Sequence, residues 1–142
     1  MKKLFISLIS VLLTVAFILC FCACGTAVNA DELWENAIYL EDTELGTGEK
    51  TVTVEVKAGE KSVVFTLKTD ASILGDVLLE HSLIEGEEGP YGMYIKKVNG
   101  ITADYDVDQS YWGFYKDGEY MITGVDTTEF SSGESFELVY TK

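Results

Sequence analysis

The sequence has no arginine, one histidine and one proline, and all three of its cysteines lie at or before Cys24. The remaining chain therefore has no residue for a disulfide, a cysteine-ligated zinc site or a thiol nucleophile. The single histidine, His81, ends an apolar stretch of helical spacing, where it is placed to cap helix carbonyls rather than to act as a base. Glycine-rich phosphate loops are missing too. These absences predict that the protein is not an enzyme.

Positive charge is also scarce. Lys2 and Lys3 lie at the very start of the chain, whereas every acidic residue lies at or beyond Asp31. From Asp31 onward 8 lysines stand against 24 acids, which gives a net charge of −16. Such a surface repels phosphate backbones, so we expect no nucleic-acid partner, and it is typical of a protein kept soluble by its charge.

A long hydrophobic run occurs only at the N-terminus. Lys2 and Lys3 precede the apolar stretch 4–19, and small residues and cysteines follow it. This order is typical of a signal peptide, and a single membrane-spanning helix is the alternative. We predict that residues 1–30 are a signal peptide and that the protein is exported.

Two cleavage sites are compatible with this signal. Cys24 follows Ala23 and precedes Gly25, which resembles the lipobox of a lipoprotein. Cleavage after Ala30 is the alternative, because small residues lie where a signal peptidase needs them. We favour lipid attachment at Cys24, which would hold the domain on the outer face of the cell membrane, with free secretion as the alternative.

The rest of the chain has mixed periodicity. Residues 31–49 are acidic and are expected to form a linker or a short helix. Residues 50–57 and 61–68 alternate between apolar and polar, which predicts a hairpin. A helix is expected over 73–81, with Asp70 or Ser72 as its cap, followed by a polar loop at 85–90.

Further strands are expected at 94–98, 110–116, 119–122 and 136–140. The Asn99-Gly100 and Asp117-Gly118 pairs predict tight turns between them. One helix packed on a mixed sheet is an α+β architecture.

Several motifs, in this order, are similar to those of the DUF4430 domain family. They are residues 66–70 with 73–78, the Val98-Asn99-Gly100-Ile101 segment, 110–115, 117–120, 123–126 and the terminal 132–140. The family is grouped with the C-terminal β-domain of the transcobalamins and intrinsic factor. The resemblance covers residues 50–142 and implies a β-grasp-like fold.

The resemblance also implies a ligand. In the cobalamin carriers this domain closes over one face of a corrinoid that is held against an all-helical domain. We expect no such helical domain in this chain, so cobalamin or a related corrinoid is an expectation that rests on fold alone.

Eight aromatic residues lie between Tyr91 and Tyr120. Tyr and Trp suit a ligand because each combines a flat apolar body with a hydrogen-bonding tip. We rank four of them as ligand contacts: Tyr91, Tyr111, Trp112 and Tyr120. Packing alone is the alternative, and so is an interaction or adhesion surface for another envelope protein.

Asp104, Asp106 and Asp108 recur at every second residue, as at the start of a calcium loop. An EF-hand needs glycine and glutamate at positions held here by Gln109 and Tyr115. We therefore predict a solvated acidic turn and no metal site.

Overall fold

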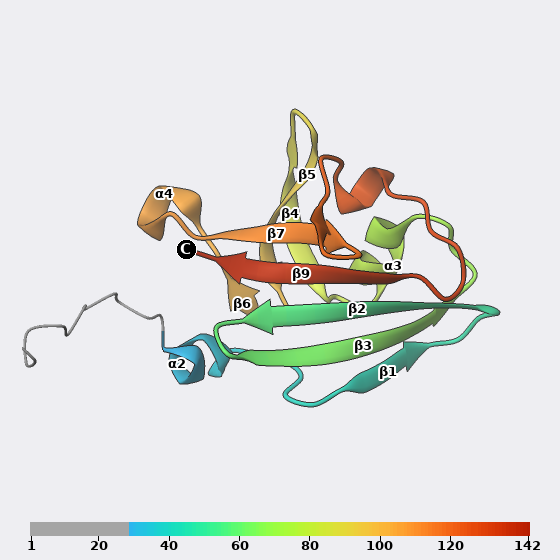
Figure 1. Cartoon of the computed structure of the whole chain (residues 1–142), viewed down its shortest axis with the longest axis horizontal. Helices are drawn as coiled ribbons and strands as arrows, with labels where there is room; N and C mark the ends of the chain where they lie inside the picture. The colour runs from blue at the N-terminus through green and yellow to red at the C-terminus, as the bar shows by residue number, and fades with distance from the viewer. Residues whose placement is uncertain (1–28) are drawn as a thin grey trace, which may run out of the picture.

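The computed structural model of the chain describes residues 29–142 (Figure 1). Its strands are β1 (Thr43–Gly46), β2 (Lys50–Ala58), β3 (Lys61–Thr69), β4 (Ile84–Gly89), β5 (Gly92–Val98), β6 (Ile101–Thr102), β7 (Tyr111–Lys116), β8 (Glu119–Tyr120) and β9 (Ser135–Thr141). Its helices are α2 (Ala30–Trp34), α3 (Leu74–Glu80) and α4 (Tyr105–Asp108), with a 3₁₀ turn, η1 (Val125–Thr127). The expected signal peptide and Cys24 lie outside these residues, apart from the last two residues of the signal. Within the described part, every helix is too short or too polar to cross a bilayer.

Strand alternation builds a six-stranded mixed sheet in the order β1-β3-β2-β9-β7-β8. The predicted hairpin is confirmed, because β2 and β3 pair antiparallel with Val54 opposite Phe65. β9 pairs parallel with β2 and antiparallel with β7, so it joins the hairpin to the rest of the sheet. Both parallel and antiparallel pairs occur, as the β-grasp-like expectation requires.

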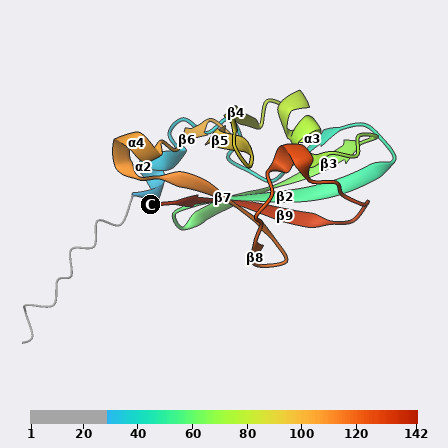
Figure 2. The same cartoon turned by 90° about the horizontal axis from the view of Figure 1, so that it is seen from above.

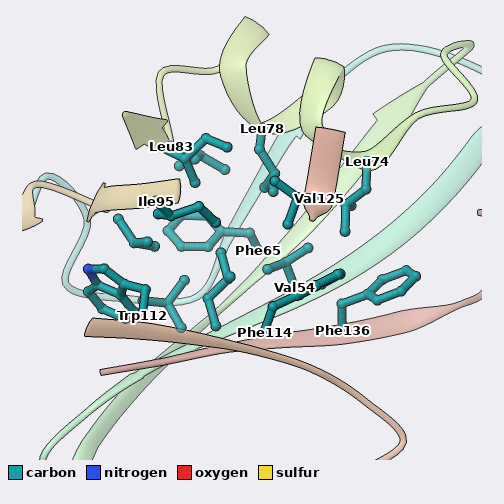
Figure 3. Packing of buried hydrophobic residues seen from close by; sticks show 14 of the residues in the cluster. Val54, Phe65, Leu74, Leu78, Leu83, Ile95, Trp112, Phe114, Val125 and Phe136 are labelled. Atoms are coloured by element: carbon teal, nitrogen blue, oxygen red, sulfur yellow. The ribbon is translucent and has the colours of Figure 1, made fainter. Parts of the chain in front are cut away.

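One face of this sheet is covered, as Figure 2 shows, by α3 and by a second sheet of order β4-β5-β6. Leu74 and Leu78 of α3 are fully buried against Phe65 of β3 and Phe136 of β9 in a single apolar core (Figure 3). Apolar burial of this kind is the main stabilising term in a domain without disulfides. The α+β fold with one packed helix is confirmed.

The segment 31–49 is more than the expected linker or short helix. It contains the short helix α2, but Trp34 of that helix is only 5 % exposed and donates a 2.9 Å hydrogen bond from Nε1 to the carbonyl of Ala58. Further on, β1 pairs parallel with β3 and forms an edge of the large sheet. The folded domain therefore begins at α2 and not at Lys50.

The expected loop at 85–90 is also wrong, because β4 pairs with β5 through this segment. The pairing brings Glu85 to 3.0 Å from Lys97, and Glu87 to 3.2 Å from Lys96. Opposite charges across two strands stabilise a hairpin that has few apolar residues of its own.

The helix α3 is where the sequence predicts it, but neither Asp70 nor Ser72 caps it. Asp70 accepts a hydrogen bond from the Glu49 amide, and Ser72 accepts one from Lys50. The first helical amide, that of Leu74, instead donates to the Thr128 carbonyl at 2.9 Å. The helix start is therefore satisfied by a distant loop.

Candidate ligand-binding groove

A groove of about 770 Å³ lies beside β7, on the side away from β9. We call it the aromatic groove. Its walls are β5 with the hairpin tip (residues 89–92), the start of α4, and the rim loop (residues 121–124) that follows β8. A volume of this size is typical of small-molecule sites.

The floor of the aromatic groove is part of the hydrophobic core. Trp112 and Phe114 are 7 % and 6 % exposed. Trp112 donates from Nε1 to the Ile101 carbonyl at 3.3 Å and meets Tyr140 edge-on at 5.7 Å between ring centroids. Phe114 stacks on Phe136 at the same centroid distance. The floor is therefore held by packing and does not depend on a ligand for its shape.

The rim has the opposite character. Tyr91 at the hairpin tip is 87 % exposed, Ile122 of the rim loop 89 % and Tyr120 58 %. Tyr105 of α4 and Tyr94 of β5 are exposed as well. Exposed aromatic and aliphatic side chains gathered around one hollow are a feature of interaction sites, because covering such an apolar patch removes it from water and lowers the free energy.

Two walls of the groove, β5 and the rim loop with the following η1, are held together by close contact. Asp126 accepts a 2.8 Å hydrogen bond from the amide of Met93. A Cβ atom on Gly124 would lie 2.3 Å from Oδ1 of Asp126 and 3.1 Å from the Met93 amide nitrogen. Any larger residue at position 124 would have to displace the Asp126 carboxylate and press on the Met93 main chain, so the spacing of the two walls depends on Gly124.

A hydrogen-bond network holds α4 at the other end of the groove. The buried hydroxyl of Ser110 accepts from the Asp104 amide at 3.0 Å and donates to Asp108. Asp108 also accepts from Nζ of Lys142 at 2.9 Å. The hydrogen bond from Ser110, followed by that from Lys142, lowers the pKa of Asp108 to about 2. Lys142 thus helps to fix the wall of the groove.

The edge of β7 presents one main-chain hydrogen-bond donor and one acceptor to the groove. The Phe114 carbonyl accepts from the Met121 amide, so this residue directs its main chain away from β9. Because the direction alternates along an antiparallel strand, the amide and carbonyl of Trp112 point the same way, to the groove. β8 pairs only with Tyr115 and Lys116, so the two Trp112 groups have no main-chain partner among residues 29–142 on that side.

Charge in the groove is mainly negative. Lys96 is the one basic residue among its lining residues, and its pKa is raised first by the hydrogen bond and charge of Glu87, then by Asp104 and Asp106. Asp104 caps α4 by accepting from the Asp106 amide at 3.0 Å. In the described part of the chain, no three His, Cys, Asp or Glu side chains are grouped to hold a metal ion.

The family follows from sequence comparison. The profile described as Domain of unknown function (DUF4430) matches residues 71–142. The chain belongs to this family. A search of curated proteins found no match to this DUF4430 protein.

Solved structures similar to the DUF4430 protein include the following two. A protein from Ruminococcus gnavus ATCC 29149, to which metal binding has been ascribed, is 41% identical, with a TM-score of 0.62 over 66% of this chain and 98% of that one. Haptocorrin in complex with Cbi is 20% identical, with a TM-score of 0.55 over 69% of this chain and 26% of that one. The second likeness shows the fold and confirms the similarity to the transcobalamin group that the sequence motifs indicate.

The four residues ranked from the sequence all line the groove of this DUF4430 domain: Tyr91, Tyr111, Trp112 and Tyr120. They have different surroundings. Trp112 is core, Tyr111 is half-buried at the start of β7, and Tyr91 and Tyr120 are at the rim, where Tyr120 meets Tyr115 edge-on at 5.3 Å. Their contact with a ligand stays a prediction.

Sequence reasoning missed two lining residues, Met121 and Ile122, and did not rank Tyr94 among the ligand contacts although it belongs to the aromatic cluster. Met121 and Ile122 gave no signal, since isolated apolar residues near turns are common. Tyr94 had one, because it lies in a predicted strand beside Tyr91, but only the pairing of β5 shows which side it faces.

Proposed function

We propose that this chain is an extracellular, membrane-anchored binding module that holds a flat, largely apolar ligand of the corrinoid type in the aromatic groove. The observation that carries the proposal is the groove itself, a hollow of about 770 Å³ with a rigid aromatic floor and exposed tyrosines around it. The fold it shares with haptocorrin, which was solved in complex with Cbi, supports the ligand class.

The ligand would be held in two ways. Rim tyrosines such as Tyr91 and Tyr120 would cover its apolar surface, and an aromatic contact contributes about 0.5–1.5 kcal/mol beyond simple burial. The Trp112 amide and carbonyl would orient it through one donated and one accepted hydrogen bond. Few polar groups in an otherwise apolar hollow are the usual arrangement of a binding site.

A binding role without turnover is part of the proposal. His81, the sole histidine, lies at the end of α3 and is not among the residues that line the groove. The groove contributes two carboxylates, tyrosines and one lysine; the lysine is ion-paired with Glu87, and Asp104 already caps α4. These roles are structural, which favours capture over catalysis.

Titration of the purified protein with cobalamin and cobinamide tests this function, by calorimetry and by the visible spectrum of the corrinoid. We expect saturable one-to-one binding that weakens at least tenfold in a Tyr91→Ala, Tyr120→Ala double variant. Leu40→Ala is the matched control, because Leu40 is 69 % exposed and does not line the groove. No heat and no spectral change at high micromolar corrinoid would refute the ligand class.

Trp112 is a poor probe of binding because it is buried in the core. Its replacement by alanine would remove the floor of the groove and also lower the free energy of unfolding by about 3–5 kcal/mol, so a loss of binding could reflect either effect. Substitutions at exposed positions such as Tyr91 usually change stability by no more than about 0.5 kcal/mol. The rim variants therefore report on binding alone.

A second candidate function is docking of another envelope protein. Tyr91 and Ile122 are almost fully exposed, which is more than a buried small ligand would need. Photo-crosslinking from position 91 in intact cells tests it. A defined crosslinked protein that is lost with Ile122→Ser but kept with Leu40→Ser would favour docking, whereas identical crosslinking in both would count against it.

A further inference from the structure

The charges around the aromatic groove have a consequence for which ligands can enter it. Lys96 is the only basic lining residue, and its Nζ lies 3.2 Å from a carboxylate oxygen of Glu87. Asp104 and Asp106 are close enough to Lys96 to raise its pKa. The groove thus offers no uncommitted cation to an incoming anion within the described residues.

The carboxylates lie next to aromatic surface. Asp104 and Asp106 flank Tyr105, which is 57 % exposed at the mouth of the groove. A tyrosine face attracts a cation and the adjacent carboxylates attract it further. Beyond the mouth, the chain from Asp31 onward carries 8 lysines against 24 acids, a net charge of −16, so the surrounding field has the same sign.

We propose that the aromatic groove selects its ligands by net charge: it accepts neutral or cationic flat ring systems and disfavours those whose net charge is negative, with Asp104 and Asp106 as the residues that set this preference. This proposal rests on the function proposed above, because both require that a flat ligand binds in the aromatic groove. It adds a rule that holds for any such ring, corrinoid or not.

The size of the effect follows from Coulomb's law. A carboxylate about 6 Å from a unit charge in water changes affinity by roughly threefold, and the factor grows where the ligand excludes water. Two carboxylates attract a cationic ring and repel an anionic one, so together they should make the affinity for the cationic ring tenfold or more higher than that for the anionic ring. Because exposed charges are screened by salt, the preference should shrink towards 1 M salt.

Two ligand pairs of equal ring size test the rule. The first is cobinamide, whose ring periphery is amidated, against cobyrinic acid, whose periphery carries free carboxylates. The second is a porphyrin with N-methylpyridinium groups against one with sulfonatophenyl groups. Dissociation constants are measured by fluorescence quenching and calorimetry with the purified protein at low and high salt.

The key variant is Asp104→Asn, Asp106→Asn. Asparagine at position 104 can still accept the hydrogen bond from residue 106 and cap α4, so the wall is kept. The matched control is Glu41→Gln, Glu60→Gln, which removes the same charge from exposed sites outside the groove. Circular dichroism checks that all variants fold.

We expect the cationic or amidated ring to bind at least tenfold more tightly, and the aspartate variant to lose most of that preference while the control keeps it. A preference that survives in the aspartate variant, or that falls equally in the control, overturns the proposal. If cobinamide does not bind but the porphyrins still show the preference, the corrinoid function fails and the charge rule stands. If none of the four rings binds, both fail.

Discussion

Replacing Trp34 with alanine tests whether the acidic segment before β2 is part of the folded domain. The Trp34 ring is 5 % exposed and belongs to the main hydrophobic core, and its Nε1 donates to the Ala58 carbonyl at 2.9 Å. Removing a buried tryptophan costs about 3–5 kcal/mol, of which roughly 1 kcal/mol belongs to the lost hydrogen bond. Domains of this size have a free energy of unfolding of about 5–15 kcal/mol, so the variant should lose a large part of it.

The assay is equilibrium unfolding in urea, followed by circular dichroism and tryptophan fluorescence from Trp112, which the variant retains. We expect a lower midpoint with an unchanged slope, which indicates a stability change without loss of two-state behaviour. Trp34→Phe separates the two contributions, because it keeps most of the packing but leaves the Ala58 carbonyl without its partner, at a cost of about 1–3 kcal/mol. A loss below 1 kcal/mol in Trp34→Ala would show that the segment is a loosely attached linker after all.

Three further predictions concern the groove and the anchor. The folded-state pKa of Asp108 is about 2, below its ordinary value of 3.8. Its contribution to the free energy of unfolding is therefore complete above pH 4 and is lost as the pH falls towards 2. The Asp108→Asn variant should not show this loss of stability in an acid titration, and a profile identical to that of the wild type would contradict the reasoning. Gly124→Ala should destabilise the protein by about 1–3 kcal/mol and weaken corrinoid binding, because its Cβ would lie 2.3 Å from Asp126; unchanged melting and binding would show that the two walls separate freely. Mass spectrometry of the mature protein should find a diacylglyceryl group on Cys24 that is lost in Cys24→Ser, whereas a mature chain starting at Asp31 would establish free secretion.

Most strands of the large sheet could be predicted because their signal is local. Val52, Val54 and Val56 alternate with polar residues, and each is at most 1 % exposed in β2. The turns were equally readable: Asn99 and Asp117 have φ of 50° and 51°, each followed by a glycine at positive φ, as a two-residue hairpin turn requires. In each case the residues that determine the structure are neighbours in the sequence.

The errors arose where partners are distant. Trp34 meets Ala58 across 24 positions, and an acidic stretch around one tryptophan does not show that it is buried. β4 has no alternating apolar face and is held by pairs such as Glu87 with Lys96, which become visible only once the register is known. The shape of the groove could not be predicted for the same reason, because α4, the hairpin tip and the rim loop come from three separate parts of the chain.

Stability and recognition are assigned to different residues of the same hollow. Trp112 and Phe114 are committed to the core and fix the floor, whereas Tyr91, Tyr120 and Ile122 contribute little to folding and are free to vary with the ligand. Because exposed positions tolerate substitution, members of the family could keep one floor and present different rims. The walls impose a limit on this freedom, since the close approach of Gly124 to the Met93 main chain and the hydrogen bond from Met93 to Asp126 set their spacing. Ligand preference in such a domain is therefore controlled by rim chemistry and charge, and the size of the ring it can take is controlled by the walls.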